Sequence, residues 1–271
     1  MKRSLALLLC SSVIALSCLL PLLWLVLTSF KSSAELTAIP PKLVPSFHWG
    51  FYHSAVTQHG LLRYIGNSVM VAGSATVISI TVASLAAYAL ARFRLAWSKF
   101  YLLALLAMSM FPQIAIAGPV WSILDHLGWL NSHYGLVTAY VALSLPLATW
   151  ILATFFAEVP VEIEEAALID GCSRFQALYK IVLPLAAPGI LTAALLVFIQ
   201  TWNEFFFALI ILTDPNVQTL PVGIALFPGE YTMPWGEIAA ASTIATLPLI
   251  ALALIFQRGI VRGLSAGAVK G

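Results

Sequence analysis

The chain has 271 residues, of which 61% are hydrophobic and only 9% are charged, and its formal net charge is +2. Because soluble domains carry about 25% charged residues, this composition excludes a water-soluble globular protein and indicates that lipid solvates much of the surface. The small net charge does not support nucleic-acid binding, and the positions of the three cysteines do not indicate a disulfide framework.

Six intervals of low charge follow one another along the chain, each long enough for the roughly 20 apolar residues that cross a bilayer. Backbone groups in lipid must form hydrogen bonds within their own segment, so we expect helices. The expected helices cover about residues 5–29, 65–91, 100–122, 134–157, 185–212 and 237–258. The predicted fold class is therefore all-α: one polytopic membrane domain, residues 1–271, with six transmembrane helices.

The first interval follows Lys2 and Arg3, which also fits a cleaved signal peptide. A signal peptide has an apolar core of about 7–15 residues and a cleavage site between small residues. This interval is longer, and no clear site follows it. We therefore expect the first helix to be retained.

Two long connections separate expected helices. Residues 31–63 are rich in proline and aromatic side chains without a helical period, and residues 213–236 contain Pro and Gly but no Lys or Arg. Loops of this length are often functional, so docking and plain connection are both open. The five histidines, for which we expect solvated side chains and no metal site, are His48, His53, His59, His126 and His133.

The distribution of lysine and arginine predicts the orientation, because these residues favour the cytoplasmic side of a membrane. With the N-terminus inside, the three basic residues outside are Lys31, Lys42 and Arg63. The ten inside are Lys2, Arg3, Arg92, Arg94, Lys99, Arg174, Lys180, Arg258, Arg262 and Lys270. We therefore expect both termini, and the polar segment 158–184, to lie in the cytoplasm.

The segment 158–184 begins like a helix. Pro160 suits the first turn of a helix, where its missing N–H is not needed. The acidic side chains of Glu162, Glu164 and Glu165 are favourable near the positive N-terminal end. An acidic face is more suited to a basic protein partner than to anionic lipid, to which surface-lying helices usually present basic residues.

The same segment also contains a turn and a second helix start. Gly171 can adopt the left-handed conformation that ends many helices. Ser173 can cap a second helix, which we expect to stop at Pro184. The prediction is a helix, a tight turn and a second helix between the fourth and fifth transmembrane helices.

The motif "QTWNEFFF" places Glu204 inside the fifth apolar interval. A carboxylate at the bilayer centre costs about 2.5–3.5 kcal/mol, so it normally faces a bundle interior or an aqueous cavity. The candidates for a substrate path are Gln200, Trp202, Asn203, Glu204 and Phe205. The alternative is that Asn203 and Glu204 cap or cross-link helices.

Two sequence motifs, one absent and one incomplete, limit the chemistry. The sequence has no G-x-x-x-x-G-K-[ST], so a phosphate loop that would hold ATP is absent from this chain. The G-x-S-x-G at residues 263–267 lacks a following Asp and His and is an accidental match to a hydrolase motif. No histidine falls in a confident span and no pair of aspartates lies in the membrane, so we expect no catalytic residues and no enzyme.

The polar segment resembles the cytoplasmic loop of binding-protein-dependent ABC importer permeases. That signature is Glu-Ala-Ala, three residues, Gly, nine residues and Ile-x-Leu-Pro. The matching positions, with Asp170 before the glycine, are Glu165, Ala166, Ala167, Gly171, Ile181, Leu183 and Pro184. The stretches "PLLWLVLTSFKSSAEL", "TWNEFFFAL" and "GLSAGAVKG" resemble the first-helix exit, fifth helix and tail of sugar-importer permeases. The chain is similar to the shorter, six-helix permease of the maltose type.

The resemblance implies a mechanism and a set of partners. The first helix of the loop would lie in a cleft of a cytoplasmic ATPase, with Glu165 paired to a basic residue and Gly171 forming the turn. ATP and Mg²⁺ would bind that ATPase, and this chain would hold no cofactor. The implied partners are a second permease, two ATPase subunits, an external solute-binding protein, a carbohydrate and membrane lipid. The tail would contact the ATPase subunits, and loop 213–236 would reach the solute-binding protein. The implied location is the inner (cytoplasmic) membrane.

Two alternatives remain open at this stage. One is an ABC permease for another solute, such as glycerol phosphate or a polyamine. The absence of cationic residues in the spans argues mildly against an anion, and Glu204 does not exclude a cation. The other is an ion-coupled secondary transporter, which usually has inverted repeats and broken helices. The sequence shows no convincing repeat and does not identify the sugar.

Overall fold

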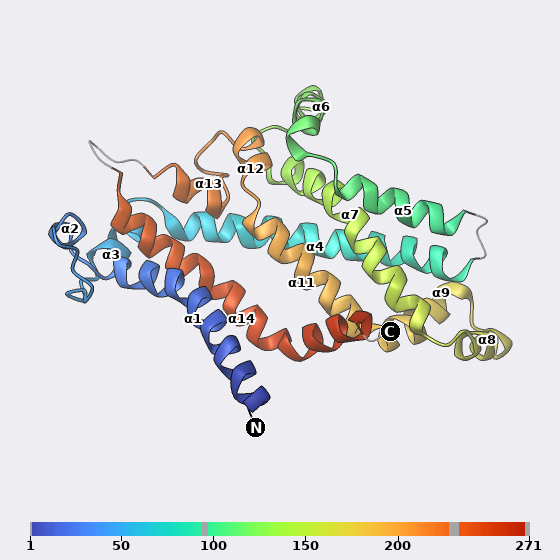
Figure 1. Cartoon of the computed structure of the whole chain (residues 1–271). Helices are drawn as coiled ribbons and strands as arrows, with labels where there is room; N and C mark the ends of the chain where they lie inside the picture. Colours follow the sequence, from blue (N-terminus) through green and yellow to red (C-terminus); the bar gives the residue numbers. More distant parts are fainter. Residues whose placement is uncertain (1, 94–96, 228–232, 269–271) are drawn as a thin grey trace. The chain divides into compact units, whose positions relative to one another are not determined.

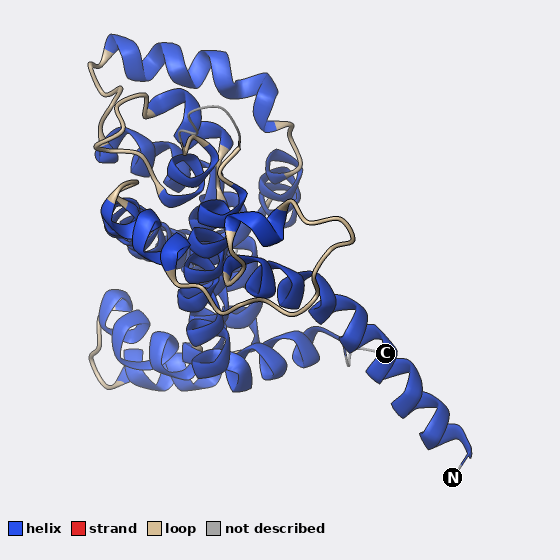
Figure 2. Cartoon of the chain, turned by 90° about the vertical axis from the view of Figure 1, so that its left-hand side faces the viewer, coloured by secondary structure: helices blue, strands red, loops and turns tan. Residues whose placement is uncertain are grey.

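The structure is a computed structural model, and it describes residues 2–93, 97–227 and 233–268. Every regular element within these residues is a helix (Figure 2), which confirms the all-helical class for the described part of the chain. Contacts divide the chain into two compact units. The first contains Met1–Ile65 and Val222–Leu249, and the second contains Gly66–Pro221 and Ile250–Gly271.

The described residues contain four uninterrupted helices that are long and apolar enough to cross a membrane. They are α1 (Lys2–Ser29) from Leu8 onward, α4 (Leu61–Arg92), α7 (His133–Glu158) and, over its first 22 residues, α14 (Trp235–Ala268). In two further pairs, consecutive helices are long and apolar enough only when the two are taken together, and each pair is sharply bent at the junction. Counting each bent pair as one span gives six, so the count of six stays a prediction.

The continuous helix expected over 100–122 is corrected by the structure. Two helices, α5 (Ser98–Ser109) and α6 (Gln113–His126), take its place and meet at 90°. Pro112 precedes α6 with extended angles of φ −60° and ψ 123°. A proline has no N–H to continue the helix and disfavours helical angles in the residue before it, which explains the break.

The helix expected over 185–212 is also divided. It contains the end of α10 (Leu183–Leu185), then α11 (Ala187–Asn203) and α12 (Phe206–Ile211). The helical segment that ends at Leu185 meets α11 at an angle of 81°. The second break lies at Glu204, whose ψ of 127° is extended.

The two long connections contain short helices that the sequence did not predict. Residues 31–63 include α2 (Ser33–Leu36) and α3 (Gly50–Thr57), and residues 213–236 include α13 (Leu220–Ala225). Residues 228–232 of the second connection lie outside the described residues. These helices have 4, 8 and 6 residues, which is too short to produce a recognisable hydrophobic period in the sequence.

Aromatic side chains organise the first unit. The ring of Phe51 in α3 lies against Gly236 of α14, at a place where a Cβ atom would collide with it. Tyr52, also in α3, is hydrogen-bonded to Ser29 at the end of α1, with 2.7 Å between the hydroxyl oxygens. The short helix α3 is thus fixed to two of the long apolar helices.

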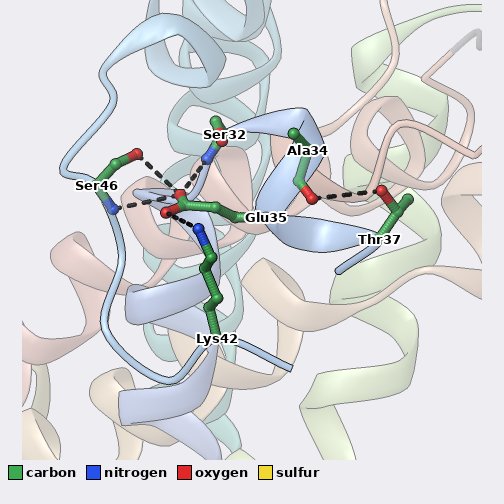
Figure 3. A network of polar contacts seen from close by, with 6 residues as sticks. All are labelled: Ser32, Ala34, Glu35, Thr37, Lys42 and Ser46. Carbon is green, nitrogen blue, oxygen red and sulfur yellow. Dashed lines mark hydrogen bonds and ion pairs between the residues drawn. The ribbon is translucent and has the colours of Figure 1, made fainter. Parts of the chain in front are cut away.

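A carboxylate organises the loop after α1 (Figure 3). Glu35 Oε2 accepts hydrogen bonds from the Ser32 amide at 2.9 Å and the Ser46 hydroxyl at 2.8 Å, and from the Ser46 amide at 3.3 Å. Lys42 Nζ lies 3.9 Å from the other oxygen, Oε1. The hydrogen bonds from Ser32 and Ser46 lower the pKa of Glu35 to about 2.

The second unit is built around α7, which the sequence placed at 134–157. This helix packs against both α5 and α11 (Figure 1). Its residues Leu152 and Phe156 are fully buried in a core that also contains Val182 and Val197. The core therefore joins α7 both to α11 and to the helical segment that directly precedes α11 in the chain.

Candidate functional site

The polar segment forms the predicted helical hairpin at one end of the second unit (Figure 1). Its first helix, α8 (Val161–Ile169), starts directly after Pro160 and ends before Gly171, whose φ is +90°. The Gly171 amide donates to the Leu168 carbonyl at 3.1 Å, and the next amide donates to Ala167 at 3.0 Å. This pair of bonds is a Schellman motif, and the predicted turn at Gly171 is confirmed.

The second helix of the hairpin starts at the predicted cap. Ser173 Oγ accepts from the Gln176 amide at 3.2 Å, and the Gln176 side chain accepts from the Ser173 amide at 2.8 Å. This capping box starts α9 (Arg174–Ala177), which continues through a π-helical turn, η1 (Leu178–Val182), into α10.

The helix was expected to stop at Pro184 but runs on to Leu185. The ring of a proline clashes with the carbonyl group four residues earlier in an α-helix. A π-helical turn immediately before Pro184 shifts the preceding hydrogen bonds, so the chain can pass the proline and bend at Ala186 instead. Single π turns are frequent at functional sites.

One face of α8 is exposed. Glu165, Ala166 and Asp170 are exposed, and the side chain of Ile169 is 85% accessible. Ala167 lies on the opposite face and is buried. In the second helix Ile181 and Leu183 are half-buried, while Pro184 is exposed. The exposed face of α8 combines a carboxylate with small and apolar side chains, a surface suited to contact another protein closely.

The other face of α8 carries a buried ion pair. Arg92 Nε, at the end of α4, lies 2.8 Å from Glu164 Oε2, and these two side chains are only 4% and 3% exposed. Tyr88, one turn earlier in α4, donates its hydroxyl to Glu164 Oε1. The acidic residues of this helix were predicted together to face a protein partner; the structure corrects this for Glu164, which is bound inside the chain.

Arg92 and Tyr88, which bind Glu164, were not among the residues predicted from the sequence. The sequence did contain a signal that Glu164 and Glu165 face different ways. Glu164 shares a helix face with Ala167, three residues later, whereas adjacent residues such as Glu165 point to a different face. The pairing itself was not visible, since Arg92 and Glu164 lie 72 positions apart. The nearby Arg94 lies outside the described residues.

Glu204 occupies the break between α11 and α12. Its Oε1 accepts from the Phe207 amide at 2.8 Å and its Oε2 from the Ala208 amide at 3.1 Å, at the start of α12. Tyr140 of α7 donates its hydroxyl to Oε2 at 2.6 Å. The carboxylate therefore caps α12 and cross-links it to α7, which is the alternative that the sequence left open. A role in a substrate path stays a prediction.

The other candidates of the substrate path do not share one surface. Gln200 lines a cavity of about 490 Å³ whose walls come from α5, α6, α7 and α12. Trp202 is buried with its ring stacked on Phe198, and Asn203 donates to the Ile199 carbonyl at 2.8 Å. Phe205 is 40% exposed. Of these residues, the structure places Gln200 alone in the cavity wall.

The part of the chain that the structure describes holds no group of three His, Cys, Asp or Glu side chains able to bind a metal ion. His133, expected to be a solvated loop residue, is instead the first residue of α7 and half-buried, with its Nε2 3.0 Å from the Val217 carbonyl oxygen. The last residues of the tail, 269–271 with Lys270, lie outside the described residues.

Comparison with known proteins agrees with these features. Residues 79–266 match the family described as "Binding-protein-dependent transport system inner membrane component". The chain is 42% identical, over 96% of its length and 94% of the relative, to the trehalose/maltose transport system permease protein MalG of Thermococcus litoralis. It is 41% identical, over 96% and 92%, to the sulfoquinovosyl glycerol transport system permease protein SmoH of Agrobacterium fabrum.

One more relative and one solved structure extend this comparison. The trehalose transport system permease protein SugB of Mycobacterium tuberculosis is 38% identical over 93% of each chain. The fold is similar to a chain in the crystal structure of a bacterial ABC transporter that imports the acidic polysaccharide alginate. The TM-score is 0.80 at 20% identity, and the match covers 94% of this chain and 95% of the other.

Proposed function

We propose a function from one premise: this chain belongs to the family of inner membrane components of binding-protein-dependent transport systems. It is a permease subunit of an ABC importer that carries a sugar across the inner membrane. The observation that carries this proposal is the hairpin from α8 to α10, in which every position of the family signature stands at its expected spacing and α8 has an exposed acidic face.

The relatives support a sugar as the substrate. Their names specify trehalose, maltose and sulfoquinovosyl glycerol, which are all glycosides. We therefore propose that this chain forms half of a translocation path for a mono-, di- or oligosaccharide. The cavity beside Gln200 supports the position of that path, because its apolar wall also contains the polar side chains of Gln113 and Thr138.

We propose that ATP and Mg²⁺ bind a separate ATPase subunit, which docks on the exposed face of α8. The absence of a phosphate loop from the sequence supports a separate ATPase. The exposed carboxylate of Glu165 is available to a basic side chain, and the exposed Ala166 lets a partner backbone come close. A short helix held in a socket transmits a displacement better than a flexible loop does.

The remaining parts of the proposal concern topology and assembly. Ten basic residues on one side against three on the other support cytoplasmic termini and six spans. The family supports a second permease, two ATPase subunits and an external solute-binding protein that meets loop 213–236. This arrangement places the hairpin in the cytoplasm, where the ATPase is.

The proposal is tested by purifying the chain from its native membrane in mild detergent and identifying the copurifying proteins by mass spectrometry. We expect a second permease, an ATPase and a solute-binding protein. The purified complex is then reconstituted, and uptake of radiolabelled trehalose, maltose and sulfoquinovosyl glycerol is measured with and without ATP. Uptake by the chain alone, driven by an ion gradient without ATP, would instead establish a secondary transporter.

A further inference from the structure

We propose that Tyr88, Arg92 and Glu164 form a joint, here called the α4 joint, that makes α8 and the end of α4 move together. In this role the three side chains are positioning residues for transport: they pass a displacement of α8 to a membrane-spanning helix. The inference rests on the proposed function, because it takes a docked ATPase as the source of the displacement.

The first observation is that α4 holds both oxygens of one carboxylate. Arg92 Nε binds Glu164 Oε2 at 2.8 Å and the Tyr88 hydroxyl binds Oε1. Tyr88 and Arg92 are four residues apart in α4 and therefore lie on one face of that helix. A carboxylate bound at both oxygens from two successive turns cannot rotate freely, so α8 is fixed in orientation as well as position.

The second observation is that the same two side chains hold the chain on either side of α8. A terminal nitrogen of Arg92 donates to the Val159 carbonyl at 2.8 Å, immediately before α8. The Tyr88 hydroxyl also lies 3.3 Å from the Arg174 carbonyl, at the start of α9. The entrance, the middle and the exit of the first hairpin helix are thus all bound to the last two turns of α4.

The third observation concerns burial and charge. The side chains of Arg92 and Glu164 are 4% and 3% exposed, so water does not compete for the ion pair. The guanidinium group supplies several donors in a rigid plane, which allows Arg92 to bind the carboxylate and the Val159 carbonyl together, whereas a lysine offers a single flexible ammonium.

The fourth observation is the alternation of adjacent acidic residues. Glu165 is exposed on the outer face of α8, while Glu164 is buried on the inner face. A force applied by a partner at Glu165 reaches the α4 joint within one residue of the same helix. The path from ATPase to membrane helix then contains no flexible connection.

The experiment uses the complete importer with its partner permease, ATPase and binding protein, reconstituted in liposomes with radiolabelled trehalose or maltose, whichever the wild type imports. The variants are Arg92→Glu, Glu164→Arg and the double charge exchange, together with Tyr88→Phe. Asp125→Arg, an acid-to-base change at an exposed position of α6, is the matched control. Copurification of the ATPase and the ATP hydrolysed per sugar imported are both measured.

We expect the single charge reversals to retain the ATPase but to hydrolyse about 2- to 30-fold more ATP per sugar, the range expected for a disrupted coupling element. The double exchange should give a ratio closer to the wild type than either single reversal, because the ion pair is re-formed while the hydrogen bonds to the Val159 carbonyl and from Tyr88 are not. Tyr88→Phe, which removes one oxygen only, should give a smaller increase, and Asp125→Arg none.

A normal ratio in Tyr88→Phe and in both single reversals would overturn the joint, as would a double exchange no better than the single variants. If a single reversal does not assemble, Tyr88→Phe and the double exchange still decide the question. Failure of the proposed function is recognised separately, because the wild-type chain would then not retain an ATPase or would not import either sugar.

Discussion

Two carboxylates organise two regions of this protein in different ways. Glu164 in the hairpin is held by Arg92 at 2.8 Å, with both side chains less than 5% exposed. Glu35 in the loop after α1 lies 3.9 Å from Lys42, whose side chain is 61% exposed. The main partners of Glu35 are instead Ser32 and Ser46, within 11 residues along the chain.

The difference shows what each network can do. A buried pair of charges is costly to separate, because the remaining charge has no water to solvate it. It therefore joins two distant segments firmly, here α4 and α8. A long ion pair with one exposed partner contributes little, and hydrogen bonds from nearby amides and a hydroxyl shape a loop without joining it to another part of the protein. Four changes test this comparison.

The largest effect is expected for Glu164→Ala, which leaves Arg92 buried without its partner. Breaking a buried ion pair in this way costs about 3–5 kcal/mol. We expect a clear decrease in the melting temperature of the purified chain, measured by tryptophan fluorescence. Glu162→Ala, an exposed position in the same helix, is the control and should melt like the wild type. Equal melting of both variants would mean that the pair does not hold the hairpin.

The sequence could predict the local parts of this site. The helix end at Gly171 and the cap at Ser173 depend on residues within one turn, so the chemistry of those residues is enough to recognise them. The pair of Arg92 and Glu164 depends on how α4 and α8 meet, which no local pattern contains. For the same reason, three neighbouring acidic residues looked equivalent until the structure separated Glu164 from Glu165.

The helix breaks show the same limit in the fold. The apolar intervals predicted where most of the helical segments lie, because hydrophobicity alone identifies them. Pro112 was a signal for the bend between α5 and α6, but proline also occurs inside uninterrupted helices, as Pro146 does in α7. At the break beside Glu204 the hydrogen bonds from the Phe207 and Ala208 amides are local, but the bond from Tyr140 of α7 is a tertiary contact between residues 64 positions apart, which no local pattern contains.

The second effect is expected for Glu165→Ala, which changes the exposed neighbour of Glu164. We expect the melting temperature of the isolated chain to stay unchanged, because Glu165 has no buried contact to lose. In the assembled importer, loss of one partner of an interfacial charge pair costs about 2–5 kcal/mol. This loss is measured as weaker ATPase binding to the reconstituted chain or as more ATP hydrolysed per sugar imported. Normal docking and normal coupling would refute the assignment of this face to the ATPase.

The third effect is expected for Gly171→Ala, which strains the turn of the hairpin. The φ of +90° at Gly171 costs an alanine about 1–2 kcal/mol, while no atom within 4 Å would collide with the added Cβ. The loss should therefore be purely conformational. Gly118→Ala, at a helical glycine of α6 with equally open surroundings, is the control and should be neutral or stabilising. The melting temperatures of the two variants give the comparison.

The smallest effect is expected in the loop of Glu35, and it depends on pH. The pKa of Glu35 is lowered from 4.5 to about 2 by its hydrogen bonds from Ser32 and Ser46. A group whose pKa is lower in the folded state stabilises the fold above its unfolded pKa and loses that contribution as the pH falls through the folded pKa. The loop should therefore hold its structure at pH 5 and loosen between about pH 4.5 and 2.

Amide hydrogen exchange of residues 31–49, corrected for the intrinsic effect of pH, measures this loosening. In Glu35→Gln the exchange at pH 5 should already be faster and should change little on further acidification, because no carboxylate remains to be protonated. Lys42→Ala should have a smaller effect than Glu35→Gln, since the ammonium group is exposed and the serine donors remain in place. If Lys42→Ala instead matched Glu35→Gln, the charge pair would organise this loop after all, and the contrast with Arg92 and Glu164 would disappear.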